Sequence, residues 1–248
     1  RYRKIQSSPQ RYTRNLQHPI RSQIMKFTKT IFTVLALITV NQVLGQQASS
    51  VNSDWQKSIV LLDITRNNHN FRVPWDKRAQ SVSKFGVVLE SKELITTATG
   101  LANHTLIRIQ KGGRGQWTNG KVLWIDYQAN LAILGVEKDE FWNNLIPVKF
   151  ADAKGLKENL QVIRWRGGNI EKRAAEFSRF TVADANFNQA PRIELKASSE
   201  IEGAGQAELM VSGNKVVGLV ASKISGTCSV IPAPFITDVI NLRKQNNY

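Results

Sequence analysis

Residues 94–101 read LITTATGL, residues 130–134 read NLAIL and residues 203–209 read GAGQAEL. The first two place an apolar run beside small or polar residues, and the third is a small-residue loop that leads into an apolar run at Leu209. Apolar, β-branched runs that alternate with turn residues are typical of short β-strands. The three segments therefore predict strand ends and the loops beside them.

Further strands are predicted on both sides of these segments. They are expected at 59–64, 85–89, 105–109, 122–125, 131–136, 161–165, 177–182, 192–195, 209–211, 216–221 and 229–231. A polar turn is expected at 67–70, and a hairpin is expected to join 85–89 to 94–97. Regularly spaced strands broken by turn signals predict an all-β sandwich or barrel.

The predicted strands fall into two sets, which a polar stretch at 151–159 divides. We therefore expect two β-domains, at 52–152 and 153–248. Pro234 opens an amphipathic segment that runs to Arg243, and proline is favourable in the first turn of a helix. The second domain is thus expected to end in a helix.

Residues 25–45 have the pattern of a secretory signal peptide, with lysines first, an apolar run at 31–40, and the small residue Gly45 at the cut with Val43 two before it. The apolar run is about half of the ~20 residues that a membrane-spanning helix needs, so we expect no membrane span after cleavage. Residues 1–24 are expected to be an upstream extension outside the mature protein, which then begins at Gln46. Export to the periplasm or the extracellular space is predicted.

The net charge of the chain is +15, but eight of its basic residues and none of its acidic residues lie in residues 1–45. The remaining surplus of +7 does not by itself define a nucleic-acid-binding face, so no nucleic-acid partner is expected. Arg164-Trp165-Arg166 and Lys172-Arg173 form a basic cluster. It is interpreted as a solvated hairpin with the tryptophan packed below, or alternatively as an anion-binding surface.

In order and spacing, the three segments quoted first resemble signatures of the HtrA/Deg protease domain. Residues 94–101 are similar to the family's Ile-Leu-Thr-Asn-Ala-His-Val-Val, and residues 130–134 to its Asp-Leu-Ala-Leu-Leu. Residues 203–209, with Val-Val-Gly at 216–218, are similar to Gly-Asn-Ser-Gly-Gly-Pro-Leu and the Val-Ile-Gly that follows it. The resemblance covers roughly 55–245. It implies a trypsin-like pair of six-stranded β-barrels, and it suggests a homo-trimer; relatives carry PDZ domains after this region.

The resemblance places Thr99 at the catalytic histidine position and Asn130 at the aspartate position. The serine position is Gly205 in the ungapped register, or Ala204 if a gap precedes it. A threonine hydroxyl is no base near neutral pH, an amide cannot stabilise an imidazolium, and neither glycine nor alanine has a nucleophilic atom. No catalytic triad is therefore expected at these positions.

The loop at the serine position has also changed. Gln206 and Ala207 replace the two glycines of the family pattern, and Glu208 replaces its proline. Side chains are expected where bare backbone is needed, and Glu202 and Glu208 are expected to bracket the loop with charge that opposes an oxyanion. A binding loop is instead predicted at Glu202, Gly203, Ala204 and Gln206.

Other residues were weighed as a displaced catalytic set. The candidate nucleophiles are Ser198, Ser199, Ser212 and Cys228, and the candidate bases are His18, His69 and His104. Turn or solvated roles are favoured for the serines and for His104. The single cysteine is interpreted as a core residue. Asp126 is interpreted as a turn residue at a strand end. No metal-ligand spacing and no phosphate-binding loop is found, so no metal or cofactor is expected.

The predicted function is that of an exported pseudoprotease that binds a polypeptide or protein partner without cleaving it. The alternatives are an active serine endopeptidase with a displaced triad, and an anion-binding module that uses the basic cluster. Phe71 and Trp75 are interpreted either as inter-subunit contacts or as local packing.

Overall fold

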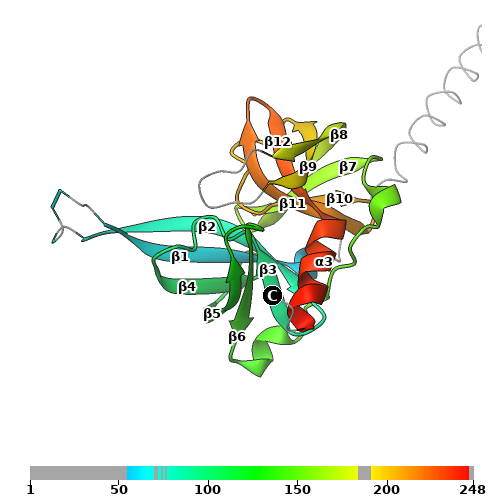
Figure 1. Ribbon diagram of the computed structural model, residues 1–248. Helices are drawn as coiled ribbons and strands as arrows, with labels where there is room; N and C mark the ends of the chain where they lie inside the picture. Colours follow the sequence, from blue (N-terminus) through cyan, green and yellow to red (C-terminus); the bar gives the residue numbers. More distant parts are fainter. Residues whose placement is uncertain (1–54, 70–71, 74, 76, 184–190, 246–248) are drawn as a thin grey trace, which may run out of the picture. The chain divides into compact units, whose positions relative to one another are not determined.

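The computed structural model describes residues 55–69, 72, 73, 75, 77–183 and 191–245. The expected signal peptide, the upstream extension, Gln46 and Phe71 lie outside the described residues. Figure 1 shows two sets of strands followed by a C-terminal helix.

The first six strands close into one antiparallel barrel, in the order β1-β2-β3-β6-β5-β4. They are β1 (Ile59–His69), β2 (Lys77–Leu89), β3 (Glu93–Thr96), β4 (His104–Lys111), β5 (Trp117–Asp126) and β6 (Leu131–Val136). A short helix, α2 (Trp55–Ser58), precedes them, and the 3-10 helix η1 (Asp139–Trp142) follows. Closure of the sheet pairs every strand on both sides, which leaves no long free edge.

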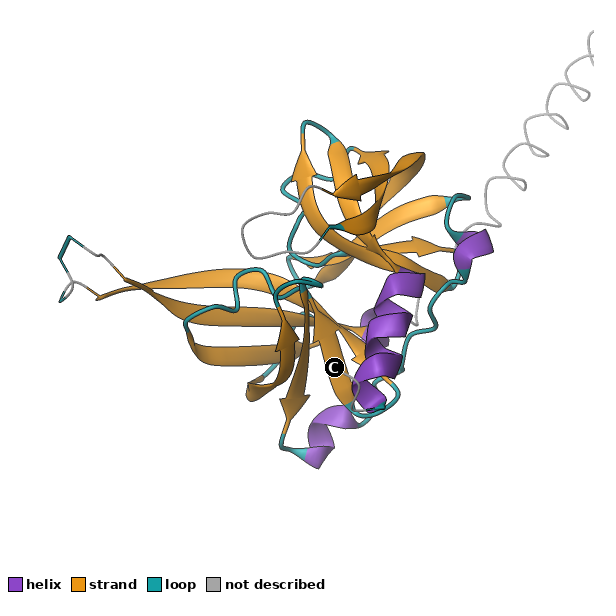
Figure 2. Cartoon of the chain, in the orientation of Figure 1, coloured by secondary structure: helices purple, strands orange, loops and turns teal. Residues whose placement is uncertain are grey.

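A second antiparallel barrel has the order β10-β11-β12-β9-β8-β7. Its strands are β7 (Leu160–Arg166), β8 (Asn169–Ala183), β9 (Arg192–Ser199), β10 (Leu209–Ser212), β11 (Lys215–Ile224) and β12 (Thr227–Pro232), after η2 (Ala153–Gly155). The terminal helix α3 (Ala233–Lys244) is the long purple helix of Figure 2. The predicted all-β double barrel with a C-terminal helix is confirmed.

The two barrels pack against each other through a shared core. One apolar cluster contains Ile59 from β1 together with Ile163, Leu209 and Ile231 from the second barrel. The indole Nε1 of Trp165 donates a hydrogen bond to the carbonyl of Ile59 at 2.8 Å. Burial of apolar surface at this contact, at about 25 cal/mol per Å², fixes the barrels so that loops from both can form one site.

Helix α3 adds a second link between the barrels. It packs against β11 and β12, and Arg243 near its end donates two hydrogen bonds of 2.9 Å to the carboxylate of Glu93 on β3. Bidentate guanidinium–carboxylate pairs combine charge with fixed geometry. No helix within the described ranges is long and apolar enough to span a membrane.

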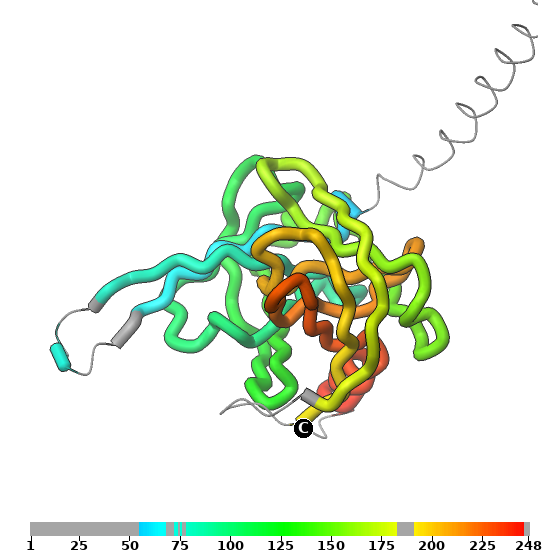
Figure 3. Tube along the Cα trace, turned by 90° about the horizontal axis from the view of Figure 1, so that it is seen from above, coloured from blue at the N-terminus to red at the C-terminus, as the bar shows by residue number. Residues whose placement is uncertain are grey.

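The expected turn at 67–70 is wrong for residues 67–69. Strand β1 continues to His69, which pairs with Lys77 of β2, while β1 leaves β4 after the pair Arg66–His104. Cross-strand hydrogen bonding to β2 thus overrides the turn preference of the asparagines. The long hairpin can be followed in Figure 3. Trp75 in its connection is 82% exposed, so the local-packing interpretation of that residue is also wrong.

Candidate functional site

Thr99 and Asn130 are brought together at one end of the first barrel. Thr99 lies in the loop after β3, and Asn130 directly precedes β6 with a positive φ of 56°. The Asn130 side-chain oxygen accepts hydrogen bonds from Thr99 N at 2.9 Å and Thr99 Oγ1 at 2.8 Å. The geometry couples the two positions as in a triad, but both groups are neutral and neither is a base near pH 7.

The loop from Ile201 to Ala207 reaches this site from the second barrel. The backbone N–H of Phe85 on β2 donates to the carbonyl of Gln206 at 2.9 Å, and Ala207 N donates to Val220 O at 3.1 Å. Ala207 has a φ of +65°, a conformation that costs a residue with a side chain more than glycine. The loop is therefore anchored to both barrels.

The carboxylate of Glu208 binds the backbone of this loop from beneath. Its Oε2 accepts hydrogen bonds from Gly205 N and Gln206 N, each at 2.8 Å, and the residue is fully buried. From the sequence, Glu202 and Glu208 were expected to bracket the loop with negative charge that opposes an oxyanion. Glu202 is indeed exposed, but Glu208 turns inward, where its carboxylate accepts hydrogen bonds from the Gly205 and Gln206 amides.

Gly205, at the serine position, has a backbone conformation and surroundings that disfavour a side chain. Its φ is +127°, and a Cβ there would lie 3.0 Å from Ser222 Cα and 3.3 Å from Lys223 N on β11. Real Cβ atoms rarely approach backbone this closely, and β11 cannot shift without disturbing its pairing to β12. The neighbouring Ala204 is buried, so the alternative serine position faces the interior.

Lys84 on β2 is a site residue that the sequence interpretation missed. Its side chain is fully buried, and its Nζ donates to Thr97 O at 2.7 Å, to Thr97 Oγ1 at 2.6 Å and to Thr99 O. Burial lowers the pKa of Lys84 to about 7, although the negative charge of Glu208 acts in the opposite direction. The sequence could have indicated it, because this lysine occupies an inward-facing position of an otherwise apolar strand.

Glu208 is the anionic counterpart of this lysine across the two barrels. Burial raises the pKa of Glu208, against the lowering effect of the hydrogen bonds from Gly205 and Gln206 and of the Arg164 charge. Arg164 Nη1 lies 3.7 Å from Glu208 Oε1, an atom without a hydrogen-bond partner among the described residues. The site thus holds a buried carboxyl group paired with Arg164, and the charge of Glu208 also acts on the buried Lys84.

The displaced-triad candidates do not assemble. The Ser199 hydroxyl donates to Ala174 O at 3.0 Å, and that of Ser212 donates to Glu158 O at 2.6 Å. His104 opens β4, with its ring Nδ1 2.8 Å from Leu101 O, and Cys228 is buried with a pKa that burial raises. Nothing joins these hydroxyls to a histidine among the described contacts; His18 and the side chain of His69 lie outside them.

Two further expectations from the sequence are met. The Asp126 carboxylate accepts from Gln128 N and Ala129 N at 2.7 and 3.0 Å, which closes the turn before β6. Trp165 is buried, as the hairpin interpretation of its cluster requires. No group of residues with metal-ligand geometry occurs in the described part of the chain.

The arginines of the basic cluster around Trp165 share an internal partner, Glu171, and the anion-binding alternative stays a prediction. Arg164 Nε donates to Glu171 at 2.8 Å, and Arg166 and Arg173 each lie 3.3 Å from the same carboxylate. Although burial opposes it, the hydrogen bond from Arg164 lowers the pKa of Glu171. Three guanidinium groups therefore share a partner within the protein.

The two closed six-stranded barrels and the C-terminal helix define a trypsin-like serine protease fold. No protein-family model matches the sequence. The chain is 28% identical over 189 residues to putative protease Do-like 13 of Arabidopsis thaliana, which covers 74% of this chain and 39% of that protein. It is 22% identical to a serine protease DegP homolog of Plasmodium falciparum, over 77% of this chain and 23% of the relative.

Solved structures show the same fold. The HtrA-type protease AlgW with decapeptide superposes with a TM-score of 0.60 at 13% identity, over 77% of this chain and 66% of that one. The active form of the Rv3671c protease of M. tuberculosis gives 0.58 at 16% identity, over 74% and 79%. The resemblance to HtrA/Deg-type proteases is thus confirmed for the protease domain, and the chain spans about two fifths or less of the first curated relatives.

Proposed function

We propose that this chain is a pseudoprotease, which uses a trypsin-like fold to bind an extended polypeptide without cleaving it. The observation that carries the proposal is the Glu208 carboxylate bound to the N–H groups of Gly205 and Gln206. In serine proteases, the N–H of the serine position stabilises the oxyanion, and one such donor is worth about 10²–10³ in rate. Here that donor is already taken by an internal anion.

The Thr99–Asn130 pair supports the same proposal. Proton transfer needs a group that is partly deprotonated near the working pH, and the two side chains supply only a hydroxyl and an amide. Lys84 has a lowered pKa, but its Nζ is enclosed by oxygen acceptors of Thr97 and Thr99. The Lys84 amine is therefore not placed to act as a general base on an exposed nucleophile.

A short stretch of β11 next to the loop has no second sheet partner among the described residues, although the Gly205 backbone approaches it at Ser222 and Lys223, and this edge supports polypeptide binding. Strand β11 pairs with β10 up to Leu219, and Val220 bonds to residues 207 and 208. Beyond this point, residues 222–224 pair only with β12 in the described part of the chain. Alternation in the two-residue hairpin at 225–226 points the N–H and C=O of Lys223 away from β12. Extended peptides bind such edges by adding a strand.

Fluorescence anisotropy with reduced, carboxymethylated α-lactalbumin as an unfolded probe tests this binding on the 46–248 protein. Lys223→Pro removes the backbone donor, and Lys223→Ala is the matched control that keeps it. Loss of one hydrogen bond of about 0.5–1.5 kcal/mol predicts roughly 2–10-fold weaker binding for the proline variant relative to the alanine variant. Absence of binding by the wild-type protein, or equal affinities of the two variants when both are folded, contradicts the proposed edge.

We also propose that the protein is exported and begins at Gln46 after signal cleavage. The charged, apolar and small-residue segments of 25–45 support this. N-terminal sequencing of protein from the exported fraction is expected to start at or next to Gln46; an intact Met25 there contradicts it. The trimer suggested by the resemblance remains a prediction for sedimentation equilibrium.

A further inference from the structure

Asn103, His104 and Thr105 form an Asn-x-Thr sequence in which x is not proline. This is the acceptor pattern for N-linked oligosaccharides, which are attached to the asparagine side chain of secreted proteins. Asn103 is the one asparagine of the chain that a serine or threonine follows at this distance. Because so short a pattern also occurs by chance, its position in the fold decides whether it can carry a glycan.

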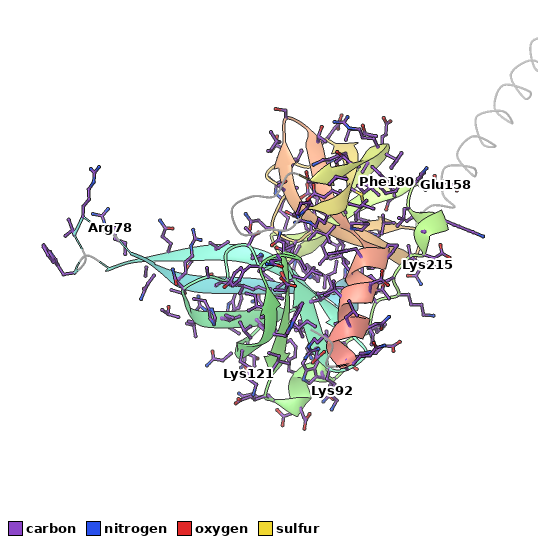
Figure 4. The ribbon with its side chains drawn as sticks, in the orientation of Figure 1. Arg78, Lys92, Lys121, Glu158, Phe180 and Lys215 are labelled. Carbon is purple, nitrogen blue, oxygen red and sulfur yellow. The ribbon has the colours of Figure 1, made fainter. Side chains whose placement is uncertain are left out.

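The pattern lies in a turn at the start of β4 in the first barrel. His104 N donates to Leu101 O at 3.3 Å, and this bond closes a turn in which Asn103 has a φ of 56°. The Asn103 carbonyl accepts a hydrogen bond of 3.1 Å from the N–H of Asn67, on the long hairpin whose other strand carries Arg78, labelled in Figure 4. Main-chain hydrogen bonds therefore hold the turn without the Asn103 side chain.

Both side chains that the modification needs are accessible. Asn103 is exposed, and its side-chain amide makes no hydrogen bond among the described residues. Thr105 is exposed as well, and its hydroxyl makes only a long contact of 3.3 Å with Thr65 O. An oligosaccharide on Asn103 can therefore extend into solvent without displacing an internal contact.

The conformation of the turn accounts for an asparagine at position 103 but not for the threonine that follows. Asparagine adopts a positive φ more easily than most residues with a side chain. Asn144 shows this preference by itself, since it is exposed with a φ of 62° but is followed by Leu145 and Ile146. Among the described asparagines with a positive φ, Asn103 alone has a hydroxyl residue two positions later.

We propose that Asn103 is an N-glycosylation site of the exported protein. In the reaction, Asn103 Nδ2 bonds to the anomeric carbon of a lipid-pyrophosphate-linked oligosaccharide. The bond from that carbon to the pyrophosphate breaks, the pyrophosphate leaves with the electron pair, and one amide proton passes to a base of the transferase. The Thr105 hydroxyl is the group by which the transferase recognises the acceptor. The proposal rests on the proposed export, because donor and transferase act in the secretory pathway.

Expression in cultured mammalian cells tests the acceptor. The 25–248 chain is produced with its own signal segment, and a second version carries 46–248 behind a cleavable mammalian signal peptide. Protein from the medium and from the cell extract is treated with peptide-N-glycosidase F in ¹⁸O-labelled water and sequenced by mass spectrometry. We expect a slower-migrating band that the enzyme converts to a faster one, and ¹⁸O-labelled aspartate in place of Asn103, with Asn144 unchanged in the same sample.

Variants separate the acceptor from the turn. Asn103→Gly removes the acceptor but keeps a residue that adopts a φ of 56°, and Thr105→Val removes the hydroxyl at nearly constant size. Both are expected to lose the mobility shift, whereas Thr105→Ser keeps it. Asn144→Gly is the matched control and is also expected to keep the shift. A glycan that persists in Asn103→Gly overturns the proposal.

The two signal peptides distinguish this inference from the proposed export. A glycan on the 46–248 version, with the 25–248 chain unglycosylated and retained in the cell, supports the acceptor site and contradicts export by residues 25–45. Secretion of the 25–248 chain without a glycan leaves the export proposal intact and overturns this inference. The same holds if the 46–248 version loses its signal peptide but carries no glycan in either medium or extract.

Discussion

Replacement of Glu208 tests whether its buried carboxylate stabilises the protein. In Glu208→Ala, the amides of Gly205 and Gln206 lose their acceptor, Arg164 loses the carboxylate 3.7 Å from its Nη1, and Lys84 loses the negative charge that raises its pKa. Breaking a buried ion pair by removing one partner costs about 3–5 kcal/mol. The two amides add about 1–3 kcal/mol each if they stay dry.

These contributions do not sum, because Lys84 can lose its proton. With its pKa lowered to about 7, deprotonation near neutral pH relieves the uncompensated charge at little cost. Glu208→Gln removes the charge but keeps an oxygen that can accept both amide bonds. We therefore expect a loss in unfolding free energy of about 3–5 kcal/mol for the alanine variant and a clearly smaller loss for the glutamine variant.

Urea unfolding of the 46–248 variants, followed by tryptophan fluorescence, measures both losses. Glu158→Ala is the matched control at an exposed glutamate and is expected to stay within about 0.5 kcal/mol of the wild-type protein. If the alanine variant is too unstable to purify, the glutamine variant still carries the comparison. An alanine variant as stable as the control would refute the buried position of Glu208.

Two other predictions follow from the same contacts. Lys84 is less protonated in the folded than in the unfolded chain between about pH 7 and its ordinary pKa of 10.5, so its contribution makes stability rise with pH across this window, and Lys84→Met should flatten the rise in a pH series of urea midpoints. Restoring the triad with Thr99→His, Asn130→Asp and Gly205→Ser should not give a competent protease, because a serine at 205 meets a φ of +127° and a 3.0 Å backbone contact. Casein hydrolysis by this variant as fast as by one that also carries Gly-Gly-Pro at 206–208 would show that only the triad had decayed.

The architecture was accessible from the sequence because it depends on local patterns. Apolar strands such as Leu131–Val136 alternate with polar turns, which predicts an all-β fold, and the resemblance of three short motifs to HtrA/Deg signatures implies the double barrel. Thr99 and Asn130 were placed at triad positions by the same resemblance, whereas the hydrogen bonds between them are seen only in the structure. Strand ends were less accessible: His69 extends β1 only because β2 offers it a partner.

The electrostatic core of the site was not accessible from local patterns. Lys84 and Glu208 lie far apart in the chain and belong to different barrels, and the partners of each come from segments that are distant in the sequence. A glutamate in place of a proline was interpreted as surface repulsion, because the sequence does not show that Gly205 and Gln206 turn their amides toward the interior. Such contacts depend on closure of both barrels and on long-range packing.

The central claim is that the site cannot perform acyl transfer, and it is tested most directly by measuring turnover and covalent labelling on one sample. Purified 46–248 protein is incubated with fluorescein-labelled casein, and in parallel with a serine-reactive fluorophosphonate followed by peptide mass spectrometry. The account predicts hydrolysis at background level and no labelled peptide. Casein turnover that copurifies with the protein, together with a phosphonate adduct on Ser198, Ser199 or another serine of this chain, would contradict it.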